Sequence, residues 1–185
     1  MRYIKGVLLG VVFLGLLITG ISLLMPSSVH SAESVTIYSS RHRIESQLHD
    51  LRSWPSWFPF SSDSITSIQF AFVQTSGRFQ AVEWTQKNQM NRIELWRSDT
   101  SGIYYRWLSP GKSPLVLHFS ILPVQDQVFS LNWTIHTITK WYPWDRFSGI
   151  FFDQQVKPGQ KQALEKLKAM LEQQANTVFN VAPRL

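Results

Sequence analysis

The sequence contains no cysteine and few charged side chains. Only 16% of its 185 residues are charged, whereas a typical soluble domain has about a quarter. The lack of cysteine excludes a disulfide framework, thiolate metal sites, a cysteine nucleophile and a lipid-modified N-terminal cysteine. The scarcity of charge argues against a coiled coil, and a net charge of +6 is too weak to point to nucleic acid.

Sequence patterns of several enzyme classes are also absent. No GxSxG, HExxH, P-loop or GxGxxG pattern occurs. His118 and His136 fall on adjacent predicted strands, but we expect both to point to solvent. Glu83 and Glu94 become cross-strand neighbours, and we interpret them as surface charges rather than as an acid–base pair. The sequence therefore predicts no catalytic residue, no metal site and no cofactor.

Apolar and aromatic residues are plentiful. They make up 44% and 14% of the chain, with 8 Trp and 12 Phe. This is enough apolar surface to offset the entropy of ordering a core, so the composition excludes a disordered protein and favours one folded domain.

The N-terminal segment has the features of a membrane anchor. The stretch Gly6–Met25 has 20 residues without a charge, and a helix of that length spans roughly 30 Å, the thickness of the bilayer core. Arg2 and Lys5 precede it, and the next basic residue is Arg41. The positive-inside rule therefore predicts a cytoplasmic N-terminus and an extracytoplasmic domain, periplasmic in a Gram-negative cell. The alternative is a signal peptide cleaved before Ala32, which would give a secreted protein.

The rest of the chain divides into a linker and one domain. We expect an anchor at residues 1–25, a polar linker at 26–33, a folded domain at 34–180 and a tail at 181–185. The linker would reach at most about 30 Å, so the domain would stay close to the bilayer.

The domain begins with a predicted strand and a helix. Ser34–Ser39 alternates polar and apolar residues, and Ser39 or Ser40 can cap a helix that carries Ile44, Leu48 and Leu51 on one face. The segment 54–59 (WPSWFP) then breaks that helix, and we interpret it as a short helical turn pressed onto the core.

Short β-rich segments follow, and they predict a meander of antiparallel strands with one solvated face. The predicted strands are Ile65–Val73, Phe79–Thr85, Asn91–Arg97, Ile103–Leu108, Leu115–Pro123 and Val128–Thr137. Keeping apolar side chains on one face determines the register, because a slip of one residue moves every side chain to the other face. The pairs predicted in this way are Val82 with Leu95, Trp84 with Ile93, Leu95 with Tyr105, Ile93 with Trp107, Ser98 with Gly102, Ile121 with Phe129, Phe119 with Leu131, Leu117 with Trp133 and Leu115 with Ile135.

A long aromatic connection over 141–159 leads into a helix predicted from Gln160 to Val178. Leu164, Leu167 and Leu171 form its apolar stripe. The inner face of the sheet is the large apolar surface available to cover that stripe.

Two stretches of the chain resemble the START-related SRPBCC, or polyketide-cyclase-like, superfamily. Val35–Pro59 looks like the opening strand, helix and tryptophan-proline turn of that family, and Tyr142–Gly149 with the following helix is similar to the closing segment of its membrane-anchored bacterial members. The resemblance implies an α+β helix-grip fold, in which a curved antiparallel sheet of about seven strands wraps around a long C-terminal helix, here preceded by a transmembrane helix. The superfamily includes lipid-transfer modules, aromatase/cyclases and other classes, so the resemblance selects no single activity.

Such a fold can leave an apolar cavity between the sheet and the last helix, and we expect it to bind a hydrophobic small molecule or lipid. An interior filled by the same aromatic side chains is the alternative. The candidate lining residues are Trp84, Leu95, Tyr105, Trp107, Leu117, Trp133, Leu167 and Met170.

The aromatic connection is a candidate lid or membrane contact, because amphipathic rings favour the membrane interface; a packed loop with ordinary surface charges is the alternative. The residues concerned are Trp141, Trp144, Arg146, Phe147, Phe151 and Phe152.

The leading hypothesis is a membrane-tethered, non-enzymatic domain that binds a hydrophobic ligand or lipid outside the cytoplasm. The first alternative is an envelope module that binds a protein partner without any ligand. An enzyme of the cyclase or hydrolase kind is a third possibility, and no nucleic-acid partner is expected.

Overall fold

The computed structural model describes residues 2–60, 70–75, 78–86 and 88–181. Its helices are α1 (Arg2–Leu23), α2 (Arg41–His49), the 3-10 helix η1 (Leu51–Ser56), α3 (Pro143–Ile150) and α4 (Phe152–Val181). Its strands are β1 (Ser28–Tyr38), β2 (Phe70–Thr75), β3 (Arg78–Gln86), β4 (Gln89–Asp99), β5 (Gly102–Leu108), β6 (Leu115–Gln125) and β7 (Val128–Ile138). Residues 65–69 of the first predicted meander strand, and the predicted tail beyond Val181, lie outside this description.

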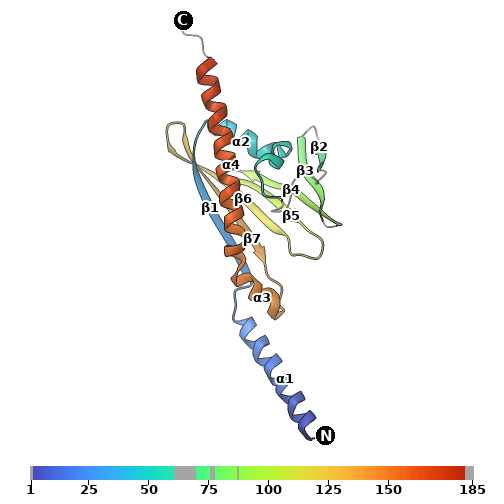
Figure 1. Cartoon of the computed structure of the whole chain (residues 1–185). Helices are drawn as coiled ribbons and strands as arrows, with labels where there is room; N and C mark the ends of the chain where they lie inside the picture. The colour runs from blue at the N-terminus through green and yellow to red at the C-terminus, as the bar shows by residue number, and fades with distance from the viewer. Residues whose placement is uncertain (1, 61–69, 76–77, 87, 182–185) are drawn as a thin grey trace.

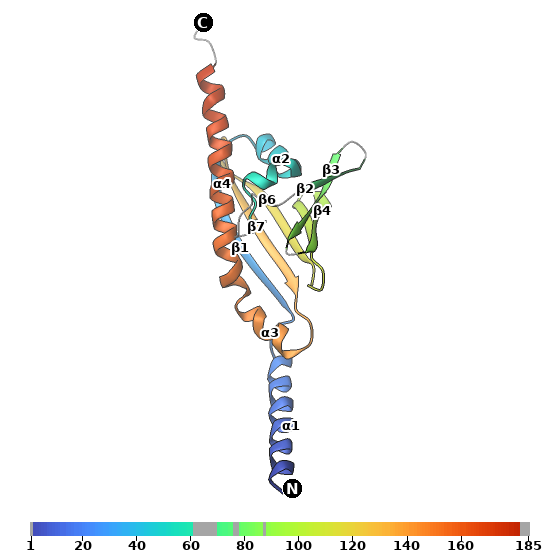
Figure 2. The same cartoon turned by 45° about the vertical axis from the view of Figure 1, so that its right-hand side comes forward.

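The strands form one antiparallel sheet in the order β1-β7-β6-β5-β4-β3-β2. Six of them follow one another as a meander, and β1 closes the sheet beside the last strand β7 (Figure 1). Helices α2, η1 and α4 cover one face of the sheet (Figure 2). This is the predicted helix-grip arrangement of α+β class.

The two faces of the sheet differ as the alternation of residues predicts. On β7, Leu131, Trp133 and Ile135 are buried beneath the helices, whereas Asn132 and Thr134 point to the other face. Each strand of this kind therefore supplies the core with every second side chain.

The predicted pairing of β3 with β4 is wrong by two residues. Val82 lies opposite Ile93 rather than Leu95. The turn has moved by one position, because Asn88 adopts a φ of +61°, a backbone conformation that asparagine tolerates better than most residues. A slip of two residues leaves every side chain on its predicted face.

The same error occurs between β6 and β7. Trp133 lies opposite Phe119 rather than Leu117, and Gln127 occupies the left-handed region with a φ of +56°. Strand β6 extends to Gln125, two residues beyond its predicted end, and has a bulge at Val124. The alternation again places the right residues in the core with the wrong partners.

Between β4 and β5 the prediction holds for the core pairs, since Ile93 faces Trp107 and Leu95 faces Tyr105. A bulge after Leu95 then shifts the register, so that Ser98 pairs with Ile103 instead of Gly102. An alternation of apolar residues carries no information about such an inserted residue.

Strand β1 begins at Ser28, six residues before its predicted start. Most of the predicted linker therefore belongs to the sheet, where Ser28–Ser34 pairs with Asn132–Ile138. These residues are mostly polar, and the backbone hydrogen bonds offered by the long strand β7 hold them there. Ser31 is buried and donates to Gln160 Oε1 at 2.6 Å.

The C-terminal helix also begins earlier than predicted. It runs from Phe152 through Pro158, and the preceding residues 143–150 form α3 rather than an irregular connection. Proline in a helix removes one backbone hydrogen bond. Phe152 and Val156 pack against the core, and burial of these side chains offsets that loss.

Helix α4 runs alongside β1. Gln160 bonds Ser31 near the start of the strand, and Glu172 Oε1 accepts from the backbone N–H of Tyr38 at its end, at 3.1 Å. Leu164, Leu167 and Leu171 are buried, as the predicted stripe requires.

Helix α1 lies outside the folded domain (Figure 1). Its segment Tyr3–Leu23 has a mean hydropathy of 2.5 and is long and apolar enough to cross a membrane. Its apolar side chains are exposed along almost the whole helix. Arg146 of α3 connects α1 to the domain by donating from Nη1 to the Met25 carbonyl at 2.6 Å.

Candidate functional site

The centre of the space between the sheet and the helices is filled by aromatic residues of η1 and the segment after it. Trp54, Trp57, Phe58 and Phe60 are almost completely buried. The ring of Trp54 lies 4.7 Å from that of Phe58 and 4.7 Å from that of Tyr105. The segment 54–59 is therefore pressed onto the core, as predicted from its sequence.

One backbone carbonyl fixes this segment to the sheet. The Leu48 carbonyl, near the end of α2, accepts from Trp54 Nε1 at 3.0 Å and from the Tyr105 hydroxyl at 2.8 Å. Burial raises the pKa of Tyr105 far above its ordinary value, so the hydroxyl remains a donor. Tyr105 therefore needs no ligand to satisfy its hydrogen bond.

A cavity of about 340 Å³ remains between the N-terminal half of α4, the residues after η1 and strands β5 to β7. We call it the apolar cavity. Its volume lies near the lower end of the roughly 300–1,000 Å³ usual for small-molecule sites. It is lined by Trp57, Phe58, Pro59, Trp107, Leu115, Trp133, Ile135, Gln155, Val156, Gly159, Gln160, Gln162, Ala163 and Lys166.

Three tryptophans of this lining have unsatisfied polar groups. Within the part of the chain that the structure describes, the buried Nε1 atoms of Trp57, Trp107 and Trp133 have no hydrogen-bond partner. Buried polar groups are normally paired, and an unpaired one costs about 1–3 kcal/mol. Gln160 is different, because its side chain already donates to the Trp133 carbonyl and accepts from Ser31. The wall of the apolar cavity therefore holds three indole N–H groups that lack a partner among the described residues.

The predicted lining residues divide into two groups. Trp107 and Trp133 line the apolar cavity. The remaining residues lie in the packed core or against it and do not line the cavity; they are Trp84, Leu95, Tyr105, Leu117, Leu167 and Met170. Residues 54–60 occupy the volume that these six were expected to enclose.

Sequence reasoning did not identify Trp57, Phe58, Val156 and Ala163 as lining residues. Three large aromatics within the segment 54–59 indicated core packing, but no feature of that segment showed that it also forms a cavity wall. Val156 precedes Gln160, the predicted start of the helix, so the predicted apolar stripe does not include its helical spacing with Ala163.

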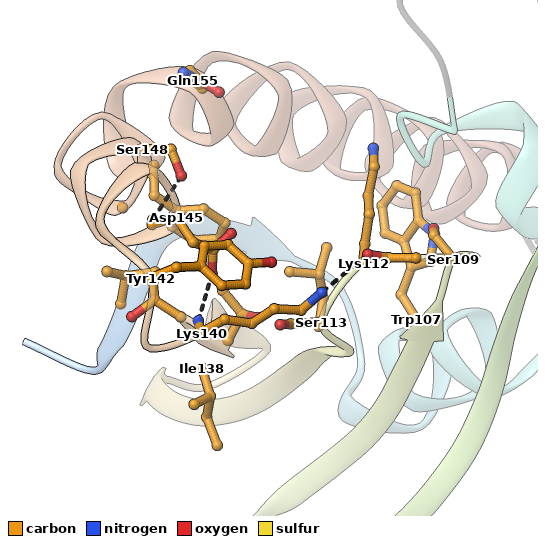
Figure 3. A pocket seen from close by; sticks show the side chains of 17 residues that line it. Trp107, Ser109, Lys112, Ser113, Ile138, Lys140, Tyr142, Asp145, Ser148 and Gln155 are labelled. Carbon is orange, nitrogen blue, oxygen red and sulfur yellow. Dashed lines mark hydrogen bonds between the residues drawn. The ribbon is translucent and has the colours of Figure 1, made fainter. Parts of the chain in front are cut away.

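A second cavity of about 420 Å³ adjoins the first, and the two share Trp107, Leu115 and Gln155. We call it the basic cavity because Lys112 and Lys140 line it. Figure 3 shows Lys140 reaching across this cavity toward the loop between β5 and β6, where its Nζ donates to the Gly111 carbonyl at 3.3 Å.

Asp145 also lines the basic cavity and accepts from the backbone N–H of Lys140 (Figure 3). Among the residues that the structure describes, neither lysine forms an ion pair with a carboxylate. The basic cavity therefore keeps a net positive charge.

The aromatic residues predicted as a lid or membrane contact lie on and around α3, next to the C-terminal end of α1 (Figure 2). Trp141 and Trp144 are 69% and 70% exposed, and Phe151 is also exposed. Phe147 is half-buried. The remaining two have other contacts, since Phe152 packs against the core and Arg146 bonds the Met25 carbonyl.

The carboxylates considered for acid–base chemistry belong to an ion-pair network on the outer face of the sheet. Arg92 bonds Glu83 Oε1 at 2.5 Å and Glu94 Oε2 at 3.0 Å, and Arg106 bonds Glu94 Oε1 at 2.7 Å. His118 stacks on Tyr104, with ring centroids 4.2 Å apart. Within the described part of the chain, no three His, Asp or Glu residues form a group suited to a metal ion.

A seven-stranded antiparallel sheet, a long C-terminal helix and a cavity between them define the START/SRPBCC-like helix-grip fold. No family model and no curated protein matches the chain. Solved structures with the same fold include a START superfamily protein from Mycobacterium smegmatis, with a TM-score of 0.58 and 15% identity over 78% of this chain and 98% of that one.

Two polyketide aromatase/cyclases are similar to the same extent. The Zhui aromatase/cyclase from Streptomyces sp. R1128 has a TM-score of 0.58 and 15% identity over 80% of this chain and 96% of that one. The di-domain aromatase/cyclase StfQ of the steffimycin pathway has a TM-score of 0.61 and 13% identity, and the match covers 80% of this chain and 52% of that one. At these identities the likeness shows the fold alone.

Proposed function

We propose that this protein is a membrane-anchored, extracytoplasmic domain that binds a hydrophobic small molecule or lipid in the apolar cavity. The observation that carries the proposal is a cavity with mainly apolar walls, lined by three tryptophans whose buried indole N–H groups have no partner among the described residues. An occupant would bury apolar surface, worth about 25 cal/mol per Å², and its acceptor oxygens would satisfy the indoles.

The lining favours binding over catalysis. Among the described residues, those of the apolar cavity include no carboxylate and no histidine, and Lys166 supplies its formal charge. General acid–base chemistry needs a titratable group within hydrogen-bond reach of the reacting atoms. A cyclase or hydrolase activity therefore has less support than ligand binding, although two proteins of similar fold are named as aromatase/cyclases.

Helix α1 supports the membrane anchor. An exposed apolar helix of this length is stable in a bilayer, where its backbone groups are paired within the helix. Lys5 precedes the apolar segment, which favours a cytoplasmic N-terminus and an extracytoplasmic domain. The proposed organisation is an anchor up to residue 25 and a domain whose first strand begins at Ser28. The mass of the mature N-terminus distinguishes this from cleavage before Ala32.

The proposal is tested at Gly159, which lines the apolar cavity on α4. A Cβ atom added there meets Pro59 at 3.9 Å, an ordinary contact, so a larger side chain can extend into the cavity without a backbone clash. Leucine or alanine also gains about 0.8–1.0 kcal/mol of helix propensity over glycine. Gly159→Leu should therefore fill the cavity without destabilising the fold, and Gly159→Ala is its matched control.

The measurement is mass analysis of the small molecules extracted from the full-length protein after purification in detergent. We expect a hydrophobic compound to co-purify with the wild type and with Gly159→Ala, and to be lost from Gly159→Leu at an unchanged or higher melting temperature. If the same compounds co-purify with all three proteins, the proposed site is wrong.

The second candidate is an envelope module that binds a protein partner. The exposed rings of Trp141 and Trp144 favour it, because tryptophan is enriched in protein interfaces. Crosslinking to one protein, which is lost on replacing these two tryptophans, together with an empty cavity in the extraction experiment, would support this candidate instead.

A further inference from the structure

The apolar and basic cavities adjoin each other, and we call the two together the groove. Both are lined by Trp107, Leu115 and Gln155, which suits them to a single elongated molecule. The walls change along the groove from tryptophan, isoleucine and valine side chains to the ammonium groups of Lys112 and Lys140. A molecule that matches both parts has an apolar chain at one end and a negative charge at the other.

The lysines have unused bonding capacity. An ammonium group carries three donors, and for Lys140 the structure shows a single acceptor, the Gly111 carbonyl. Asp145 in the same cavity is engaged by the backbone N–H of Lys140 rather than by its ammonium. Among the described residues neither ammonium has a carboxylate partner, which favours an anion bound beside them.

The basic cavity lies at the end of the domain that carries α1. Thr139, adjacent to Lys140, donates from its backbone N–H to the Ser27 carbonyl at 2.9 Å and from Oγ1 to the Pro26 carbonyl at 3.4 Å. Helix α1 ends at Leu23. If α1 spans the membrane as proposed above, the two lysines lie close to the lipid head groups.

We propose that the groove binds an anionic membrane lipid, with its phosphate between Lys112 and Lys140 and one acyl chain in the apolar cavity. This inference rests on the proposed function and adds the chemical class of the ligand and its direction. Trp107 lines both cavities, and its buried Nε1 has no hydrogen-bond partner among the described residues. In this binding mode the head group lies at the end of the domain that carries α1.

The test uses the full-length protein in vesicles of phosphatidylcholine. Two photoreactive probes are compared at the same low content, phosphatidylglycerol and phosphatidylcholine, each with a diazirine in one acyl chain. Adducts are mapped by mass spectrometry to two segments of the chain. The first is residues 155–166, the part of α4 that lines the apolar cavity, and the second is α1. Labelling of α1 is the internal reference for reconstitution.

We expect the anionic probe to label residues 155–166 more than the zwitterionic probe, by a factor on the order of ten, since two lysines favour a lipid of net negative charge. Lys112→Gln with Lys140→Gln should abolish this preference. The control is Lys161→Gln with Lys168→Gln, which removes the same charge from α4 outside both cavities and should retain it.

Replacement of Lys112 and Lys140 by arginine keeps the charge and should restore the preference, which separates a charge effect from a folding defect. Equal labelling of residues 155–166 by both probes, or a preference that survives the glutamine variants, would overturn the anionic-lipid assignment but not the proposed function. Labelling of α1 without any labelling of residues 155–166 by either probe would also overturn the anionic-lipid assignment, whereas the extraction experiment with Gly159→Leu decides the proposed function.

Discussion

The Leu48 carbonyl permits a quantitative test of how the cavity wall is held in place. It lies in the last turn of α2, where carbonyl groups lack intrahelical partners. Trp54 Nε1 and the Tyr105 hydroxyl both donate to it. If one donor is lost, the other still pairs the Leu48 carbonyl. The loss of one donor should therefore be tolerated better than the loss of both.

The magnitudes follow from this shared acceptor. Tyr105→Phe keeps the ring and should lower the free energy of unfolding by about 1 kcal/mol, the net worth of one hydrogen bond. Trp54→Phe should cost more, because it also leaves unfilled volume in the core. The double variant strands a buried carbonyl, which adds about 1–3 kcal/mol, so its cost should exceed the sum of the single costs by about 1–2 kcal/mol.

The assay is urea unfolding of the full-length protein in detergent, followed by tryptophan fluorescence. Tyr104→Phe is the matched control, because Tyr104 is the neighbouring residue on β5 and its hydroxyl lies 2.9 Å from Ser101 Oγ at the exposed face. Its replacement should change stability by less than about 0.5 kcal/mol. If the Trp54 and Tyr105 effects are additive, or if Tyr105→Phe is no more costly than Tyr104→Phe, the carbonyl does not hold the wall as argued.

Three further predictions concern other parts of the chain. Gln160→Leu removes both hydrogen bonds of this buried side chain and should lower the free energy of unfolding by about 2–4 kcal/mol in the same urea assay. Trp141→Ser with Trp144→Ser should reduce the quenching of fluorescence by brominated lipids in vesicles, while stability changes by less than about 0.5 kcal/mol because both rings are exposed; unchanged quenching would show that neither ring contacts lipid. The hydrogen bond from the Arg52 side chain holds the pKa of Asp50 below its ordinary value of 3.8, so its stabilising effect is complete well above pH 3.8 and is lost as the pH falls through the lowered pKa; Asp50→Asn should make the acid limb of a stability–pH curve shallower.

The fold class was predicted from the resemblance to the START-related superfamily, and the meander and the buried face of each strand were predicted from the residue pattern. The buried faces follow from a period of two residues, which survives errors in pairing: Trp133 faces Phe119 instead of Leu117, yet it remains in the core. The partners were wrong because turn positions depend on local backbone conformation. Asn88 and Gln127 adopt positive φ values, and neither belongs to a strong two-residue turn pattern such as Asn-Gly.

The ends of β1 and α4 could not be read from hydrophobic periodicity. The residues after Pro26 are polar, and they join the sheet because β7 offers them backbone partners. Pro158 indicates the start or the end of a helix in most sequences, but here the burial of Phe152 and Val156 extends α4 beyond it. In both cases a tertiary contact overrode the local sequence preference.

The candidate site was the least predictable part, and the reason bears on how the protein works. The meander alone places six suitable side chains around the centre of the sheet, and nothing in their spacing shows that Trp54 and the residues after it fill that centre. Because they do, the free volume is displaced toward Gly159 and the N-terminal half of α4. That half of the helix continues from α3, which Arg146 ties to the end of α1. The aromatic filling therefore does more than stabilise the domain: it leaves the free volume toward the end of the fold next to α1. If α1 is the membrane anchor that we propose, a ligand from the membrane has its shortest path there.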